Sequence, residues 1–144
     1  MYQRILVPTD GSDVTAKAVQ TAIGLAKLSG GQLVTISVKE PFPYSAISEM
    51  QPVPPQEFYD AQERIASARV KAVQEAAEAA GLSCQAHTVE ALHAWEAIID
   101  HAKTQRCDLI VMASHGRRGI ARVLLGSQAV NVLTHSTVPV LICR

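Results

Sequence analysis

Five consecutive apolar residues, Leu109–Ala113, are the feature that most constrains the fold of this chain. A run this short, without polar alternation, is typical of a strand buried on both faces of a parallel sheet. A loop with glycines and arginines follows, and then a small pair, Gly126 and Ser127. The pair precedes a helical pattern in which three apolar residues fall on one face, namely Ala129, Val130 and Leu133.

The rest of the chain repeats this alternation of strand and helix. Strands are expected at residues 5–7, 33–38, 83–90, 109–113 and 138–143. Helices are expected from Ser12 or Asp13 to Gly30, at about 56–80, at 93–105, and from the 126–127 pair to residue 135. Such alternation implies right-handed crossovers and a parallel sheet covered by helices on both faces. A length of 144 residues fits one domain.

Three helices are expected to bury apolar stripes, and one long segment is expected to be irregular. The stripes are Val19, Ala22, Ile23 and Ala26, then Ile65, Ala68, Ala72, Val73 and Ala76, then Trp95, Ile98, Ile99 and Ala102. Residues 40–55 hold five of the seven prolines, which excludes regular helix and central strand. A loop of this length is usually a functional lid or a mobile segment.

Composition excludes several classes of function. The net charge is zero, so nothing predicts wholesale binding to nucleic acid or to an anionic membrane. No apolar run reaches membrane-spanning length, and the first residues lack the layout of a signal peptide. The three cysteines, Cys84, Cys107 and Cys143, are an odd number without metal-site spacing. They are expected to be reduced, buried thiols of a cytoplasmic protein.

The loop after the Leu109–Ala113 run has the chemistry of a phosphate site. A helix start leaves backbone N–H groups without intrahelical partners, and these groups attract phosphate oxygens together with the positive end of the helix dipole. Glycine lets the backbone approach a ligand closely because it has no Cβ. Ser127 adds a hydroxyl donor at the same place.

These residues also form a recognisable pattern. The sequence Ser-His-Gly, nine residues, then Gly-Ser, after an apolar strand, closely resembles the nucleotide-binding signature of the universal stress protein family. That signature is Gly-x-x-Gly, nine residues, then Gly and Ser or Thr. Gly116, Gly126 and Ser127 match its last three fixed positions, and Ala113 replaces the first glycine. The resemblance extends over the whole chain.

The resemblance implies an α/β fold of the adenine nucleotide alpha hydrolase-like type. This fold is a doubly wound, five-stranded parallel sheet with strand order 3-2-1-4-5 and helices on both faces. Ligands of such sheets bind beyond the carboxyl ends of the strands, where the winding direction reverses. The reversal falls between the first and fourth strands. The turn at Asp10 and the loop at residues 114–119 are therefore expected to face each other across one crevice.

The resemblance also implies a ligand, ATP, with Mg²⁺ or Mn²⁺ bound through its phosphates. Asp10 is expected at the ribose or the metal, the backbone of Val38 at the adenine edge, and Gly116, Gly126 and Ser127 at the phosphates. Arg117 and Arg118 are candidates for neutralising phosphate charge. The full set expected to bind nucleotide is Pro8, Thr9, Asp10, Val38, Met112, Ala113, His115, Gly116, Arg117, Arg118, Gly126, Ser127 and Gln128.

A homodimer is expected through the last strand, residues 138–143. Val140, Leu141 and Ile142 are apolar and belong to an expected edge strand, which invites pairing with another chain. Pro139 has no N–H, which suits the start of an edge strand. The resemblance implies the same pairing between two subunits.

Three functions remain open at this point: a regulatory ATP-binding module with an unknown protein partner, an ATP-hydrolysing or adenylate-transferring enzyme, and a dimeric family member that binds no nucleotide. The chain lacks Gly-x-x-x-x-Gly-Lys-Ser/Thr, and it lacks Gly-x-Gly-x-x-Gly after the first strand. Residues 112–127 contain no carboxylate or glutamine that would position an attacking water. The binding module is therefore favoured, with at most slow ATP hydrolysis.

Overall fold

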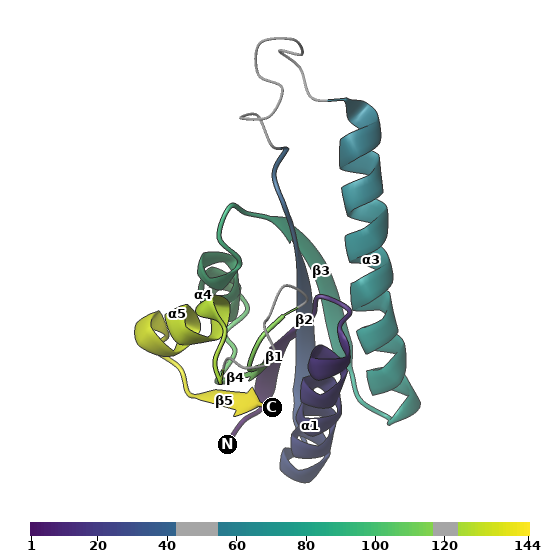
Figure 1. Cartoon of the computed structure of the whole chain (residues 1–144). Helices are drawn as coiled ribbons and strands as arrows, with labels where there is room; N and C mark the ends of the chain where they lie inside the picture. Colours follow the sequence, from purple (N-terminus) through teal and green to yellow (C-terminus); the bar gives the residue numbers. More distant parts are fainter. Residues whose placement is uncertain (43–54, 117–123) are drawn as a thin grey trace.

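The computed structural model describes residues 1–42, 55–116 and 124–144. The strands form a five-stranded parallel sheet in the order β3-β2-β1-β4-β5, which confirms the predicted order (Figure 1). The strands are β1 (Arg4–Pro8), β2 (Gln32–Lys39), β3 (Cys84–Glu90), β4 (Leu109–Ala113) and β5 (Val140–Cys143). The helices are α1 (Asp13–Ser29), α3 (Gln56–Ala79), α4 (Ala94–Thr104) and α5 (Ser127–His135).

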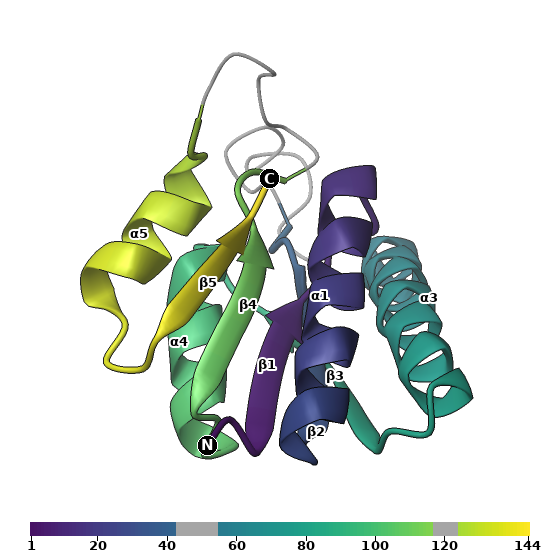
Figure 2. The same cartoon turned by 90° about the horizontal axis from the view of Figure 1, so that it is seen from below.

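The sheet lies between two layers of helices. Figure 2 shows α1 and α3 on one face and α4 and α5 on the other. Successive strand residues point to opposite faces, so Ile5 and Val7 pack with α1 and α3 whereas Leu6 packs with α4 and α5. All five residues of β4 are buried, as expected for a strand covered on both sides.

Helix α1 begins and ends as its sequence predicts. The backbone N–H of Thr15 donates a hydrogen bond to Oγ of Ser12 at 3.3 Å, so Ser12 is the N-cap. Gly30 ends the helix with φ of 72°, a conformation that favours glycine. The predicted stripe of Val19, Ala22, Ile23 and Ala26 is buried against the sheet, which confirms it.

Two predicted stripes are buried only in part. Helix α3 buries Ala66, Val70, Val73 and Ala77, whereas Ile65, Ala68 and Ala72 are exposed and Ala76 is only partly buried. Helix α5 buries Ala129 and Val132, whereas Val130 and Leu133 are 44% and 43% exposed. Each of these helices contacts the sheet with one narrow row of residues. Helix α3 packs on β2 and β3, and the nine-residue α5 lies beside the edge strand β5. The other apolar residues of the predicted stripes therefore do not reach the core.

The last strand begins two residues later than predicted. Oγ of Ser136 accepts a hydrogen bond from the N–H of Val138 at 3.1 Å, which folds residues 136–138 into a turn, and β5 begins at Val140.

Cys84 and Cys107 are buried free thiols, and burial raises the pKa of each to about 11. Cys143 is free but only partly buried. Most of the proline-rich segment, residues 43–54, lies outside the described residues. In the described parts of the chain, no helix combines the length and apolarity needed to cross a membrane.

Candidate functional site

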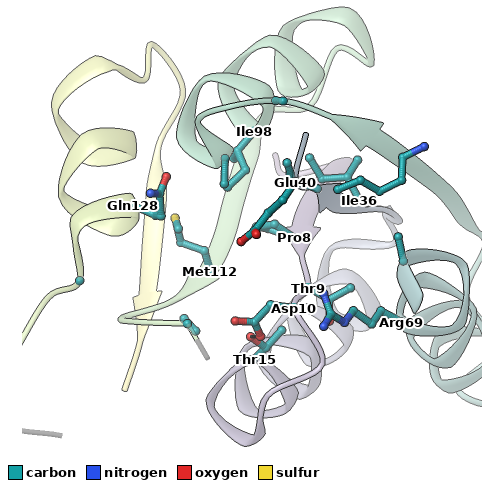
Figure 3. A pocket seen from close by; sticks show the side chains of 18 of the residues that line it. Pro8, Thr9, Asp10, Thr15, Ile36, Glu40, Arg69, Ile98, Met112 and Gln128 are labelled. Atoms are coloured by element: carbon teal, nitrogen blue, oxygen red, sulfur yellow. Dashed lines mark hydrogen bonds between the residues drawn. The ribbon is translucent and has the colours of Figure 1, made fainter. Parts of the chain in front are cut away.

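A cavity of about 920 Å³ lies at the carboxyl ends of β1 and β4, where the winding of the sheet reverses (Figure 3). This is the position at which doubly wound sheets hold their ligands. Every described member of the predicted site lines it: Pro8, Thr9, Asp10, Val38, Met112, Ala113, His115, Gly116, Gly126, Ser127 and Gln128. Arg117 and Arg118 lie outside the described residues.

The turn after β1 holds the carboxylate of Asp10 in a fixed orientation. Its Oδ1 accepts hydrogen bonds from the backbone N–H of Ser12 at 2.9 Å and from the hydroxyl of Thr15 at 2.7 Å. Oγ1 of Thr9 accepts a hydrogen bond from the N–H of Gly11 at 3.2 Å, which tightens the same turn. Asp10 is therefore held by its own turn and by the first turn of α1.

The two loops that the sequence predicts to face each other are in contact. A Cβ placed on Gly116 would lie 2.6 Å from Oδ2 of Asp10. No larger residue fits at position 116 unless the Asp10 carboxylate moves, and that carboxylate is held by Ser12 and Thr15. Glycine at this position is therefore explained by a close approach inside the site.

Gly126 lines the cavity directly before the first residue of α5. Its N–H donates a hydrogen bond to the carbonyl of Ser114 at 2.6 Å. A Cβ at position 126 would lie 3.2 Å from Cα of His115 and 3.3 Å from the carbonyl oxygen of Ser114. Gly126 is also the N-cap of α5, so among the described residues no side chain caps this helix. The N–H groups of the first turn and the helix dipole thus offer an anion site beside Ser127.

Gln128 lines the cavity, but its side chain also caps a neighbouring helix. Oε1 of Gln128 accepts a hydrogen bond from the backbone N–H of Trp95 at 2.8 Å, in the first turn of α4. Trp95 stacks on His135 with ring centroids 4.5 Å apart and an interplanar angle of 24°. Trp95 is a packing residue between α4 and α5, as expected, and it does not line the cavity.

Sequence reasoning missed the wall of the cavity that α3 supplies. Gln62, Ile65, Ala66 and Arg69 line the cavity from α3, and their spacing of three, four and seven residues places them on one helix face. Ile65 is 45% exposed because it faces this cavity rather than the core. The sequence signal for this wall was the apolar Ile65 next to polar residues on the predicted helix. Only the fold shows that this helix face turns toward the cavity.

Further lining residues come from the end of β2 and from α4. Glu40 follows β2, and its carboxylate projects over the sheet edge toward Met112 in Figure 3. Ile98 of α4 adds an apolar surface beside Val38 and Ile36. Apart from Glu40 and Gln128, the cavity is apolar near Met112 and Ile98, and its polar end is at Asp10, Thr15 and the two glycines.

A histidine pair lies outside the cavity, on the same side of the sheet as α4. Nε2 of His101 and Nδ1 of His87 are 3.0 Å apart, so one ring donates a hydrogen bond to the other. Burial lowers the pKa of His101, and the charge of His87 lowers it further. No local sequence pattern connects these two residues, which belong to β3 and α4. Within the described ranges, no three His, Cys, Asp or Glu side chains are grouped as they would be to hold a metal ion.

Comparisons with known proteins agree on one family. The model of the Universal stress protein family matches residues 1–144. Universal stress protein MJ0531 of Methanocaldococcus jannaschii is 32% identical, covering 100% of this chain and 83% of that protein. Universal stress protein YxiE of Bacillus subtilis is 33% identical, covering 100% of this chain and 100% of that protein.

Solved structures share the fold. Universal stress protein UspA from Lactobacillus plantarum superposes with a TM-score of 0.84 at 24% identity, covering 99% of this chain and 98% of that one. A universal stress protein in complex with cAMP superposes with a TM-score of 0.70 at 27% identity, covering 99% and 97%. These structures have the adenine nucleotide alpha hydrolase-like fold seen here. The chain belongs to the universal stress protein family.

Proposed function

We propose that this chain is a single universal stress protein domain, residues 1–144, that binds ATP and acts as a regulatory module. The observation that carries the proposal is the contact between Asp10 and Gly116, beside a helix start that no described side chain caps, in a cavity at the switch point of the sheet. A similar protein of the family forms a complex with cAMP, an adenine nucleotide, which supports the ligand class.

The residues present suit a nucleotide whose base lies at the apolar end. The base would pack near Val38, Met112 and Ile98, and the phosphates would meet the N–H groups at the start of α5, with Ser127 as an added donor. Asp10 would accept a hydrogen bond from a ribose hydroxyl. Mg²⁺ or Mn²⁺ would be carried by the phosphates, with Asp10 the carboxylate at that end of the cavity.

The proposed module binds ATP without consuming it quickly. Rapid hydrolysis needs a residue that orients the attacking water. Gln128 directly follows Ser127, but its side-chain carbonyl oxygen accepts a hydrogen bond from the N–H of Trp95. The rival proposal is an ATP hydrolase or adenylate-transferring enzyme. Turnover near one per second, on the order of ordinary enzymes, would favour that rival, provided that Gly116→Ala abolishes it.

Calorimetric titration with MgATP tests the proposal. Gly116→Ala should reduce affinity at least about tenfold, because a Cβ there displaces the Asp10 carboxylate. Gly24→Ala is the matched control, since a Cβ at Gly24 meets no atom within 4 Å. Equal ATP affinity in folded Gly116→Ala and Gly24→Ala would refute the site. A wild-type protein that binds no adenine nucleotide would favour the family member that works by dimerisation alone.

We also propose a homodimer through β5 and a cytoplasmic location. β5 is an edge strand, and its Leu141 is 39% exposed. An apolar sheet edge of this kind favours pairing with a second chain. The free thiols of Cys84 and Cys107 suit a reducing compartment. ATP binding would act on an unidentified protein partner by changing the surface around the cavity.

A further inference from the structure

We propose that His87 of β3 and His101 of α4 form a binding site for a divalent transition-metal ion of the copper(II) or nickel(II) kind. The two ring nitrogens that face each other would both bind the ion, and water would fill its remaining positions. Neither histidine lines the cavity described above. Metal binding here therefore does not depend on the proposed nucleotide site.

The two histidines come from elements that are separate in sequence but lie on one face of the sheet. His87 pairs with Ile36 in the parallel register of β2 and β3, so the two side chains share a face. Ile36 packs in the core cluster that includes Ile98 and Ala102 of α4. His101 precedes Ala102 on that helix. Each ring is therefore held by a regular element, a paired strand on one side and a packed helix on the other.

The distance between the two facing nitrogens matches that of two neighbouring ligands on one metal ion. Nε2 of His101 and Nδ1 of His87 are 3.0 Å apart. Metal–imidazole bonds of about 2.0–2.1 Å, the zinc value, place two ligands about 2.8–3.0 Å apart at a right angle and about 3.3–3.4 Å apart at the tetrahedral angle. The observed separation fits the right angle, which is the preference of square-planar or tetragonal copper(II) and nickel(II).

The rings are oriented so that an ion can reach both nitrogens. Their centroids are 4.8 Å apart and their planes are inclined by 62°, so the rings do not stack. Rotation about χ2, which has a broad minimum in histidine, can turn the two nitrogen lone pairs from each other toward one ion. Both side chains are partly exposed, so the ion can enter from solvent.

The surroundings favour the neutral imidazoles that metal binding requires. Burial lowers the pKa of His101, and the charge of His87 lowers it further. In the neutral pair, one ring donates its N–H to the other ring. When the ion enters, the donor ring loses that proton to solvent and takes up one at its outer nitrogen. Both facing lone pairs then bind the ion, and no net proton is released.

Two protein ligands make this an open site rather than a closed cage. Throughout residues 1–42, 55–116 and 124–144, no His, Cys, Asp or Glu side chain joins such a pair as a third ligand. Affinity at a nitrogen site rises from nickel to copper and falls again at zinc. We therefore expect copper(II) to bind most tightly and nickel(II) next. Zinc should bind less well, because its tetrahedral angle needs a wider separation of the two nitrogens.

Calorimetric titration with NiCl₂ tests the site, on protein that carries no affinity tag and has been freed of metal. His87→Gln and His101→Gln should each reduce nickel affinity at least about a hundredfold, because loss of a group that only supports a metal ligand already costs about 10–100-fold. His93→Gln is the matched control and should bind nickel as wild type does. His93 is an exposed histidine at the N-cap of α4, its side chain makes no capping hydrogen bond, and it does not line the cavity.

Two further measurements show whether a loss of binding comes from misfolding. Electron paramagnetic resonance of wild type, with less than one equivalent of copper(II), should show splitting from two nitrogen ligands. NiCl₂ should raise the urea midpoint of wild type and of His93→Gln, because a ligand that binds only the folded state stabilises it. It should not raise the midpoint of His87→Gln or His101→Gln. MgATP affinity should be the same in these variants as in wild type, so failure of either site is seen separately.

The metal site is refuted if wild type binds nickel no more tightly than the double variant His87→Gln/His101→Gln. It is also refuted if His93→Gln loses as much affinity as either of the two proposed ligands does. Zinc that binds more tightly than nickel would overturn the right-angled geometry and with it the metal class.

Discussion

The two walls of the cavity are built by different means. On the β1–β4–α5 side, which we call the backbone wall, the shape depends on close approaches of glycine backbone: Gly116 lies against Asp10, Gly126 lies against Ser114, and the N–H groups at the start of α5 face the site. On the α3 side, the wall consists of side chains on one helix face. A backbone-built wall needs glycines at fixed spacing and tolerates few substitutions. A wall of side chains can change its chemistry while the fold is kept, so we expect ligand preference to reside there.

The largest effect is expected from Gly126→Val, in the backbone wall. The valine Cβ would lie 3.1 Å from Cβ and 3.2 Å from Cα of His115, and its two methyl groups would add further bulk beside the start of α5. We expect ATP affinity to fall at least about a hundredfold by calorimetry, equivalent to about 2.7 kcal/mol. Gly24→Val, with no atom within 4 Å of its Cβ position, should bind normally. Unchanged ATP affinity in folded Gly126→Val would show that this wall does not hold the nucleotide.

A smaller effect is expected from Ser127→Ala, which leaves the backbone wall intact. One hydrogen bond to a charged group is worth about 1.5–3 kcal/mol, which corresponds to a tenfold to hundredfold loss of affinity. The loss should appear with ATP and be absent with adenosine, which has no phosphates. A similar loss for both ligands would place Ser127 away from the phosphates.

A further contrast concerns the outer edge of the sheet, where Leu141 of β5 is 39% exposed. Leu141→Lys should weaken the proposed homodimer about tenfold, because burial of a leucine side chain contributes about 1.5–3 kcal/mol. Sedimentation velocity over a concentration series measures this. Leu28→Lys places the same charge on α1, where Leu28 is already 88% exposed, and should leave the dimer unchanged. Wild-type protein that sediments as one chain at micromolar concentration would contradict the dimer.

The smallest effect is expected in the pH dependence of the free energy of unfolding, through the histidine pair of β3 and α4. Burial and then the charge of His87 lower the pKa of His101 below 6.5, so the unfolded chain binds this proton more readily than the folded one. The contribution to stability is complete above pH 6.5 and is lost as the pH falls from 6.5 through the lowered pKa. Urea unfolding at pH 7.5 and pH 5.5 should show a larger decrease for wild type than for His101→Gln. Equal decreases would show that His101 does not contribute.

The parts that the sequence predicted well are those in which backbone geometry determines residue type. The buried strand at β4, the N-cap Ser12, the C-cap Gly30 and the contact across the crevice between Asp10 and Gly116 belong to this group. The strand order came from the family resemblance, and the pairing in the structure confirms it. The ligand that these residues bind remains a prediction.

The parts that the sequence did not predict depend on how far each helix covers the sheet. Ile65 looked like a core residue because helical spacing alone does not distinguish a face on the core from a face on a cavity. Leu133 shares an apolar helix face with Ala129 in the sequence pattern, but it is 43% exposed because α5 lies at the edge, where little sheet remains to cover it. The place of Arg69 in the cavity wall and the hydrogen bond between His87 and His101 both depend on residues far apart in the sequence. No local sequence pattern could therefore predict them.

The hydrogen bond from Trp95 to Gln128 gives the molecule an optical reporter of its own site. The chain contains one tryptophan, and its ring stacks on His135 at one end of α5 while its backbone N–H is held by Gln128 at the other end. Indole emission depends on the ring's immediate surroundings. A rearrangement at the start of α5, where Gln128 follows Ser127, would therefore be expected to change the surroundings of the indole. We expect the fluorescence of the unlabelled protein to change when the cavity is filled.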